Sequence, residues 1–310
     1  MDKIILGDIM WRDFGEKVKN LRIAKKLTRE DICGDEKELS IRQLARIESG
    51  QSIPSLAKVM VIAKALEVSV GLLTDSKDFE LPRRYKELKY SLLRTPTYTD
   101  EFRLSQRDNQ LSEIFIDHYE SLPEVEQIIV DCLQTSMDVT LSDNTNYGCE
   151  IINEYLEQLK IKERYLANDL ILIDLYLVCC RTSKFSKEWY DEKLYNSLLD
   201  KVLGQIDLLD VEDLFLLNQL LVTFFSISIQ LENKIQVKKI VKASKKVTTK
   251  IQDFQRMPIL NLMEWKYNLY FKKDQLTAEV CYNKALQFAL LMGNHHLEEN
   301  IRREWENDIK

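Results

Sequence analysis

The stretch LSIRQLARIESG at residues 39–50 decides the fold of the first part of this chain. Ser40 is a preferred N-cap residue, and Leu44 and Ile47 recur at helical spacing. Gly50 can adopt the left-handed conformation that commonly ends a helix. The stretch therefore predicts a short helix with one apolar face, a defined start and a defined end.

The other face of this helix is polar and basic. Arg42, Gln43 and Arg46 share it, because residues three and four apart are neighbours on a helix. Arginine and glutamine are suited to guanine and adenine edges in the major groove. We therefore predict the second helix of a helix-turn-helix, with Ser40, Arg42, Gln43 and Arg46 as DNA-binding residues. The alternative is an ordinary surface helix whose arginines are solvated.

The flanking sequence predicts further short helices around this one. A first helix is expected over residues 12–26, Thr28 caps a second and Ser55 caps a fourth. Five helices in about 65 residues is the size of a lambda-repressor-type DNA-binding domain. Arg22 and Glu48 are expected to pair inside this domain rather than to touch DNA.

The remainder of the chain predicts helix after helix. Only 8 glycines and 5 prolines occur in 310 residues, which favours helices with short connections over many strands. Residues 278–289 have the small and aromatic alternation of a tetratricopeptide repeat helix. We predict an all-α chain: a DNA-binding domain over 1–75, a linker over 76–84, and a right-handed tetratricopeptide-like solenoid over 85–310.

Charge is unevenly distributed along the chain. Residues 1–75 carry 13 basic and 12 acidic side chains, whereas residues 76–310 carry 31 and 38. This balance excludes a protein whose whole surface embraces nucleic acid. A single near-neutral DNA-binding module has modest affinity, which favours a dimer on two half-sites.

Signals for enzymes, metals and membranes are weak. The six cysteines form no CxxC pair, no histidine stands at zinc-ligand spacing from them, and no phosphate-binding or nucleophile-elbow motif occurs. The longest uncharged run, residues 214–231, contains polar residues that suit a buried helix better than a membrane span. We expect no catalytic, cofactor or metal site, and a soluble cytoplasmic protein.

Polar side chains on otherwise apolar helices have two interpretations. Asn168 and Asn218 could bridge to neighbouring helices, or they could hold the backbone of an extended peptide. A lysine-rich segment over residues 234–250 is expected to be a solvated helix face, with a second DNA contact as the alternative.

Several longer strings extend the comparison beyond a generic helix-turn-helix. They are LSIRQLARIESGQS at 39–52, LPRRYKELKY at 81–90, LRTPTY at 93–98, NDLILIDLY at 168–176 and EDLFLLN at 212–218. Through them the chain resembles the Rgg-like peptide-pheromone receptors of Gram-positive bacteria over nearly its whole length. It is most similar to the competence regulators whose pheromone carries two adjacent tryptophans.

The resemblance implies a cytoplasmic receptor for a short, imported hydrophobic peptide. Such receptors resemble monomers at rest, with the DNA-binding domain held against the repeats. Peptide frees that domain, and a homodimer forms on palindromic double-stranded promoter DNA. The expected targets are competence genes, namely an alternative sigma factor and the pheromone precursor. The alternatives are a paralogue that controls a bacteriocin operon, and a protein-binding scaffold with a vestigial DNA-binding domain.

The resemblance also implies roles for individual positions. Thr97 and Arg107 would lie near the peptide entrance, and Asn168 and Asn218 on the floor of the groove. Thr99 departs from some relatives, which have a basic residue there, so the peptide preference is expected to differ.

Charge complementarity suggests how the resting state is held. Glu124 and Glu126 begin a helix in the acidic part of the chain, and Arg42 and Arg46 need partners when DNA is absent. We hypothesise that these carboxylates pair with the arginines and hide them. Arginine–carboxylate contacts are strong enough to bias such a two-state element.

Overall fold

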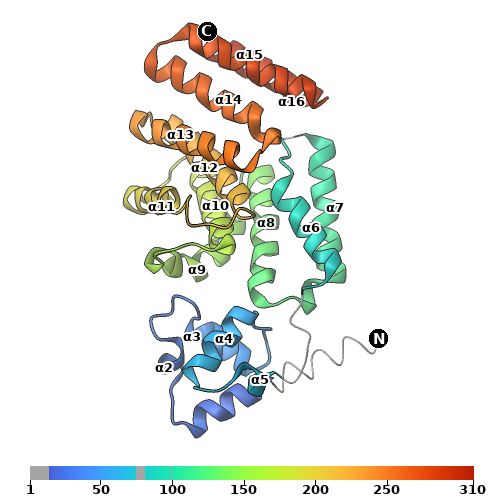
Figure 1. Ribbon diagram of the computed structural model, residues 1–310, viewed down its shortest axis with the longest axis vertical. Helices are drawn as coiled ribbons and strands as arrows, with labels where there is room; N and C mark the ends of the chain where they lie inside the picture. The colour runs from blue at the N-terminus through green and yellow to red at the C-terminus, as the bar shows by residue number, and fades with distance from the viewer. Residues whose placement is uncertain (1–13, 75–80, 99) are drawn as a thin grey trace.

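The computed structural model describes residues 14–74, 81–98 and 100–310, and all of its regular structure in these ranges is helical. A small cluster of short helices forms the N-terminal part (Figure 1). A larger stack of helices forms the rest and ends, at the far side, with the C-terminus. The predicted all-α class, with a helix-turn-helix part followed by tetratricopeptide-like helices, is confirmed.

The N-terminal part has the five helices that the sequence predicts. A first helix covers residues 14–24, and the start of the predicted segment lies outside the described residues. The others are α2 (Arg29–Cys33), α3 (Ile41–Glu48), α4 (Leu56–Ala65) and α5 (Val70–Leu73). Their apolar faces meet in one core, which includes Phe14, Val18, Leu39, Leu44, Ile47, Ile62 and Leu66.

Local signals set the ends of these helices. The hydroxyls of Thr28, Ser40 and Ser55 each accept a hydrogen bond from a backbone N–H in the first turn that follows. After α3 the chain turns at Gly50, whose φ of 71° lies in the left-handed region that favours glycine. The predicted start and end of the second helix of the motif are therefore confirmed.

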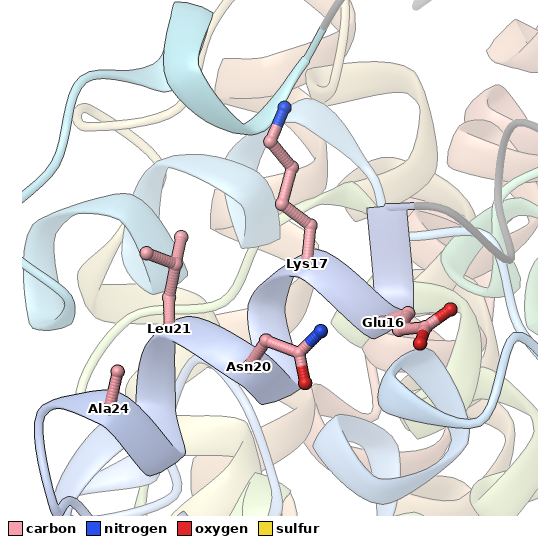
Figure 2. Close-up of a pocket in the computed structure, with 5 residues that line it drawn as sticks. All are labelled: Glu16, Lys17, Asn20, Leu21 and Ala24. Atoms are coloured by element: carbon pink, nitrogen blue, oxygen red, sulfur yellow. The ribbon is translucent and has the colours of Figure 1, made fainter.

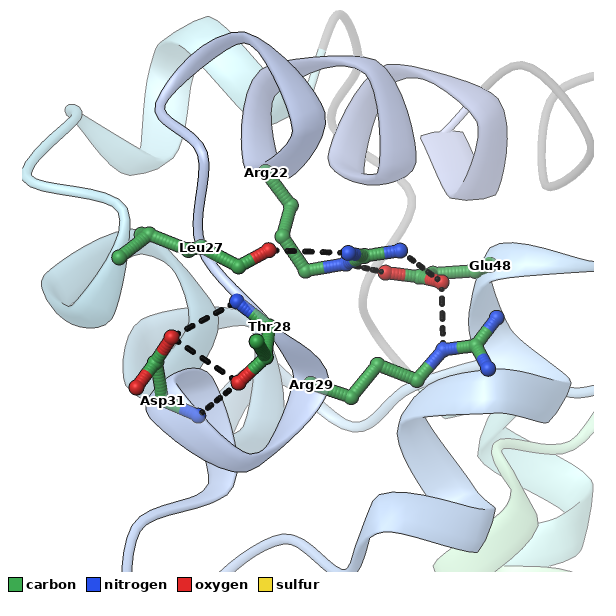
Figure 3. A network of polar contacts seen from close by, with 6 residues as sticks. All are labelled: Arg22, Leu27, Thr28, Arg29, Asp31 and Glu48. Atoms are coloured by element: carbon green, nitrogen blue, oxygen red, sulfur yellow. Dashed lines mark hydrogen bonds and ion pairs between the residues drawn. The ribbon is translucent and has the colours of Figure 1, made fainter.

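A buried ion-pair network fastens α3 to the preceding helices (Figure 3). Arg22 Nε donates to Glu48 Oε1 at 2.6 Å, and Arg29 Nε donates to Glu48 Oε2 at 2.8 Å. The predicted pair between Arg22 and Glu48 is thus confirmed, and Arg29 is an addition. Because both cations bond the carboxylate, Glu48 stabilises the domain and does not face solvent.

The larger part, which we call the repeat domain, begins at Arg83. Its helices are α6 (Arg83–Arg94), α7 (Glu101–Asp117), α8 (Glu124–Ser142), α9 (Cys149–Ile161), α10 (Ala167–Thr182), α11 (Glu192–Gly204), α12 (Leu214–Gln230), α13 (Lys234–Ile251), α14 (Met257–Lys266), α15 (Gln275–Leu291) and α16 (His295–Asp308). Single turns of 3-10 helix, η1 (Tyr119–Ser121), η2 (Thr145–Gly148) and η3 (Phe254–Arg256), and the π-helical η4 (Tyr267–Lys272) connect some of them. Neighbouring helices pack in antiparallel pairs around one continuous apolar core.

Two expectations about the repeat domain need correction. The predicted linker over 76–84 runs too far, because Arg83 and Arg84 already form the first turn of α6 behind Pro82. Residues 75–80 of that linker lie outside the described residues. The predicted helix over residues 258–272 changes at Tyr267 from α-helical to π-helical geometry.

The C-terminal helices close the stack with a second aromatic core. The rings of Tyr282 and Trp305 stack with centroids 4.7 Å apart, and Trp265 packs against both at nearly right angles. Asp308 accepts hydrogen bonds from Trp265 Nε1 and Lys266 Nζ, each at 2.7 Å. These contacts fasten α16 to α14.

All six cysteines are free thiols, and five of them are buried. Burial raises the pKa of Cys33, Cys179 and Cys180 to about 12, so these thiols stay protonated at neutral pH. Among the described helices, none combines the length and the apolar character that a membrane crossing needs.

Candidate nucleic-acid interface and its contact with the repeat domain

The predicted recognition helix α3 does not face open solvent. Its polar face, which we call the recognition face (Arg42, Gln43 and Arg46), lies against the ends of α8 and α9 (Figure 1). The side chain of Arg42 is 70% exposed and that of Arg46 is 37% exposed, whereas Gln43 is buried. The repeat domain therefore covers part of the surface that the sequence assigns to DNA.

A single carboxylate holds the centre of this contact. Glu124 is the first residue of α8 and is buried, and its Oε1 accepts a hydrogen bond from Arg46 Nη1 at 3.0 Å. Its Oε2 accepts from Ser52 Oγ at 3.4 Å and lies 3.5 Å from Lys58 Nζ. Three groups of the N-terminal domain therefore converge on Glu124, and we call this set the Glu124 cluster.

The backbone contributes to the same contact. The backbone N–H of Glu124 donates to the carbonyl oxygen of Ile53 at 2.8 Å. The first N–H groups of a helix have no partner within that helix. The loop before α4 therefore caps α8, and separating the two domains would leave this N–H to water.

Lys58 is the least satisfied member of the Glu124 cluster. Its side chain is 8% exposed, and within the described residues its Nζ has no hydrogen-bond partner. Burial lowers the pKa of Lys58, and the negative charge of Glu124 opposes that shift. Neither Lys58 nor Ser52 was predicted, because nothing local in the sequence distinguishes them from surface residues of α4 and its preceding loop.

The edges of the recognition face make different contacts. Arg42 Nε lies 3.4 Å from Glu154 Oε1 on α9, at an exposed position where salt weakens the pairing. Gln43 Oε1 accepts from the backbone N–H of Ser40, and the hydroxyl of Ser40 accepts from the backbone N–H of Gln43. Gln43 also hydrogen-bonds Tyr155 on α9.

This arrangement corrects one part of the prediction for DNA-binding residues. Ser40 and Gln43 were expected to face bases together with the arginines. In the structure they form a reciprocal capping box at the start of α3, which occupies both side chains. The arginines are the members of the predicted set that keep N–H groups at the surface.

A small polar cavity of about 160 Å³ lies beside the Arg46–Glu124 pair. Besides Glu124, the carboxylates of Asp131, Glu150 and Glu154 line it. Burial raises the pKa of Asp131, and the hydroxyl of Tyr119, which donates to it at 2.7 Å, opposes that shift. The repeat domain thus presents an acidic surface to the basic recognition face.

Glu126 does not take part in this contact, contrary to our hypothesis. Its Oε2 accepts hydrogen bonds from Lys89 Nζ at 2.7 Å and from the hydroxyl of Tyr85 at 2.6 Å, both on α6. Two residues along a helix differ by about 200° in direction. When Glu124 faces α3, Glu126 must therefore face another neighbour.

The residues assigned to the peptide do not form one cluster. Asn218 is completely buried between α12 and α13, where its amide donates to Thr248 Oγ1 at 3.0 Å and accepts from Ser244 Oγ at 2.8 Å. Its assignment to an open groove floor is therefore wrong for this conformation, and the bridging interpretation holds. Asn168 is half-buried in the first turn of α10.

The two residues assigned to the peptide entrance lie near the connection between α6 and α7. Thr97 is half-buried, and its carbonyl oxygen accepts from the backbone N–H of Asp100 at 3.0 Å. Arg107 on α7 is also half-buried and donates to the carbonyl oxygen of Leu92 at 2.7 Å. Thr99 lies outside the described residues.

A further hollow lies on the outer face of the first helix (Figure 2). Its lining residues are Glu16, Lys17, Asn20, Leu21 and Ala24. Because one helix supplies all of them, the hollow is a depression of the surface, and we assign it no ligand.

Comparison with known protein families agrees with this architecture. A family model described as ComR tetratricopeptide matches residues 82–305, and a helix-turn-helix model matches residues 18–73. A search of curated proteins finds no match.

Several solved structures are similar to the whole chain. ComR from Streptococcus suis is 36% identical, with 97% of this chain and 96% of that chain covered and a TM-score of 0.80. The apo form of ComR from S. thermophilus is 28% identical, with 96% and 99% covered and a TM-score of 0.82. The S. thermophilus ComR complex with DNA and its signalling peptide ComS has the same identity, coverage of 96% and 100%, and a TM-score of 0.66. The helix-turn-helix, the repeat helices and these matches together show that the chain belongs to the ComR family.

Proposed function

We propose that this protein is a peptide-responsive transcription regulator that holds its own recognition helix in a covered state. The observation that carries the proposal is the Glu124 cluster, in which one buried carboxylate bonds Arg46 and faces Lys58. A guanidinium that is paired with a carboxylate cannot at the same time donate to a base or a phosphate. Contact with the repeat domain and binding of DNA by this face therefore compete.

Similarity to two states of one relative supports the view that this is the resting arrangement. The chain superposes better on apo ComR from S. thermophilus than on the complex of that protein with DNA and ComS, with TM-scores of 0.82 and 0.66. Sequence identity is the same in both comparisons, so the difference comes from the arrangement of the parts. In the proposed cycle, a peptide favours the second arrangement and separates α3 from α8.

The proposed ligand is a short hydrophobic peptide that binds the repeat domain. It is imported into the cytoplasm, where the promoter DNA lies, and we expect tryptophan among its residues. The N-terminal part of the chain carries almost no net charge, so one copy gains little from phosphate contacts. We therefore propose that the activated protein binds a palindromic site as a homodimer and is a monomer at rest. The proposed targets are competence promoters, with a bacteriocin operon as the alternative.

The test is a titration of promoter DNA by the full chain in the presence of synthetic hydrophobic octapeptides. We expect one peptide class to tighten DNA binding and to convert the protein to a dimer on DNA, as measured by fluorescence anisotropy and light scattering. If no short hydrophobic peptide changes either quantity, the proposed function is wrong.

A double substitution of the recognition face separates regulation from scaffolding. Arg42→Ala with Arg46→Ala should abolish promoter binding, because it removes the guanidinium donors, and should leave peptide binding intact. If promoter binding survives, α3 is not the recognition helix. If no promoter fragment binds the wild-type protein either, a protein-binding scaffold becomes the better description.

A further inference from the structure

A recessed carboxylate in the repeat domain has fewer partners than its position requires. Asp174 lies on α10, and its Oδ1 accepts a hydrogen bond from Thr223 Oγ1 on α12 at 2.6 Å. An ionised carboxylate offers about four acceptor positions. Within the described ranges no cation lies close enough to Asp174 to form an ion pair. The residue keeps partial exposure, so its remaining positions are reachable.

Three arginines surround Asp174, and two of them bond to other groups. Arg107 on α7 donates to the carbonyl oxygen of Leu92 at 2.7 Å. Arg256 donates to Asp253 at 3.0 Å and to Gln219 at 3.3 Å. Arg181 acts on Asp174 only through its charge. None of the three therefore neutralises the carboxylate by direct contact.

The charges confirm that this arrangement is unsatisfied. Burial raises the pKa of Asp174, although Thr223 and the surrounding arginines favour its ionised form. Burial also lowers the pKa of Arg107, and Asp174 only partly offsets this. Each group would be stabilised by a new hydrogen-bond partner of the opposite kind.

A purely structural role for Asp174 does not account for these features. The hydrogen bond to Thr223 joins α10 to α12, but a neutral side chain would do the same without the cost of a buried charge. Arg107 likewise uses one printed contact of a guanidinium that carries five N–H groups. Both side chains therefore have capacity that the protein itself does not use.

The two helices that carry these groups are packed separately. Arg107 comes from α7, which packs on α6 and α8, and Asp174 comes from α10, which packs on α8, α9 and α12. An acceptor and a donor thus reach one region from two directions. An extended peptide passing between them presents backbone N–H groups on one side and carbonyl oxygens on the other.

We propose that Asp174 and Arg107 form a two-point site for the backbone of the bound peptide. Asp174 accepts a hydrogen bond from a peptide N–H, Arg107 donates to a peptide carbonyl oxygen, and Thr223 is a positioning residue for Asp174. This inference rests on the proposed function, because it assumes that the repeat domain binds a peptide.

The experiment measures the affinity of the full chain for the octapeptide selected in the promoter titration, by calorimetry. Asp174→Asn keeps the shape of the side chain and removes its charge. We expect binding to weaken about tenfold or more, since hydrogen bonds to charged groups contribute roughly 1.5–3 kcal/mol. Asp200→Asn, at an exposed position on α11, is the matched control and should leave affinity unchanged.

A series of octapeptides, each with one backbone N–H replaced by N–CH₃, distinguishes a direct contact from a structural effect. One position in the series should weaken binding to the wild-type protein and have little effect on Asp174→Asn, because the partner is already absent. If every N-methyl position has the same effect on both proteins, the proposal is wrong. If acetylation of the peptide N-terminus cancels the effect of Asp174→Asn, the ligand group is the terminal ammonium and the backbone site is wrong.

Two further measurements keep the test decisive. Should Asp174→Asn fail to fold, Thr223→Val carries the same comparison, because it keeps the carboxylate and removes its positioning hydroxyl. Affinity of the wild-type protein should also fall as the pH is lowered from neutral, because protonated Asp174 loses acceptor strength. A wild-type chain that binds no octapeptide would instead contradict the proposed function itself.

Discussion

At the scale of single residues, the position of one carboxylate decides which surface is covered. Glu124 and Glu126 are two residues apart and equally acidic, yet only Glu124 contacts the recognition face. Glu124 also faces buried Lys58, whose charge has no other acidic partner among the described ion pairs. Removing one member of a buried ion pair is costly because the other charge remains without compensation. Separation of the domains removes that cost by exposing Lys58 to water.

This comparison predicts opposite outcomes for two similar substitutions. Glu124→Gln should raise peptide-independent promoter binding by at least about tenfold, because it destabilises the covered state relative to the open one. Glu126→Gln should leave that binding unchanged, since its carboxylate bonds α6. The measurement is fluorescence anisotropy of promoter DNA without peptide. Equal basal binding of Glu124→Gln and the wild-type protein would rule out the Glu124 cluster as the restraint.

Glu48 predicts a pH dependence of stability. Burial alone would raise the pKa of Glu48, but its hydrogen bonds with Arg22 and Arg29 outweigh this and lower it. A carboxyl group with a lowered pKa contributes stability above its unfolded pKa of about 4.3, and that contribution is lost as the pH falls through the folded value. Glu48→Gln should therefore cost about 3 kcal/mol at neutral pH and progressively less in acid. Urea unfolding at several pH values tests this, and a pH-independent difference would contradict it.

At the scale of elements, close approach of helices depends on the smallest residue. A Cβ atom added to Gly15 in the first helix would lie 2.1 Å from the carbonyl oxygen of Ile47 in α3. The backbone of α3 cannot yield as a flexible side chain can, and Ile47 is in the core of the domain. Gly15 therefore sets the distance between the first helix and the recognition helix.

Two glycine substitutions test this packing. Gly15→Ala should destabilise the N-terminal domain by about 1–3 kcal/mol, despite the better helix propensity of alanine, because it overpacks the crossing. Gly71→Ala in α5 is the matched control, since nothing lies within 4 Å of its added Cβ. Thermal unfolding of both variants is the measurement. A Gly15→Ala protein as stable as Gly71→Ala would show that the crossing can relax.

At the scale of the whole molecule, two domains share one contact that must open for DNA to bind. The contact is small and polar, which suits a regulator that must separate its parts. To convert a population from 1% to 99% open, a ligand must bind the open state about 10⁴-fold more tightly, or about 5.5 kcal/mol. Peptide and DNA act on the same equilibrium, so each should increase the affinity for the other.

Hydrogen exchange follows this opening directly. The Glu124 amide, bonded to Ile53 across the domain contact, should be protected in the protein alone and should exchange faster when peptide and promoter DNA are bound. The buried amide of Leu175 in α10 provides an internal control that should keep its protection. Unchanged exchange at Glu124 in the DNA complex would mean that the domains stay together.

Local signals in the sequence determined the elements of the N-terminal domain and much of its chemistry. The caps at Thr28, Ser40 and Ser55, the turn at Gly50 and the Arg22–Glu48 pair depend on residue type and helical period, which act over a few residues or within one small core. The same period placed Arg42 and Arg46 on one face.

Only the tertiary structure decided which neighbour each polar side chain meets. Helical period gives the angle between Glu124 and Glu126, but it does not say which of them turns toward α3. It does not show that Gln43 is buried in its own capping box, or that Lys58 lies opposite Glu124. Asn218 likewise bonds within the repeat domain rather than facing a groove. These outcomes depend on how separately formed helices pack, because contacts between segments far apart in sequence follow from the summed fit of many side chains.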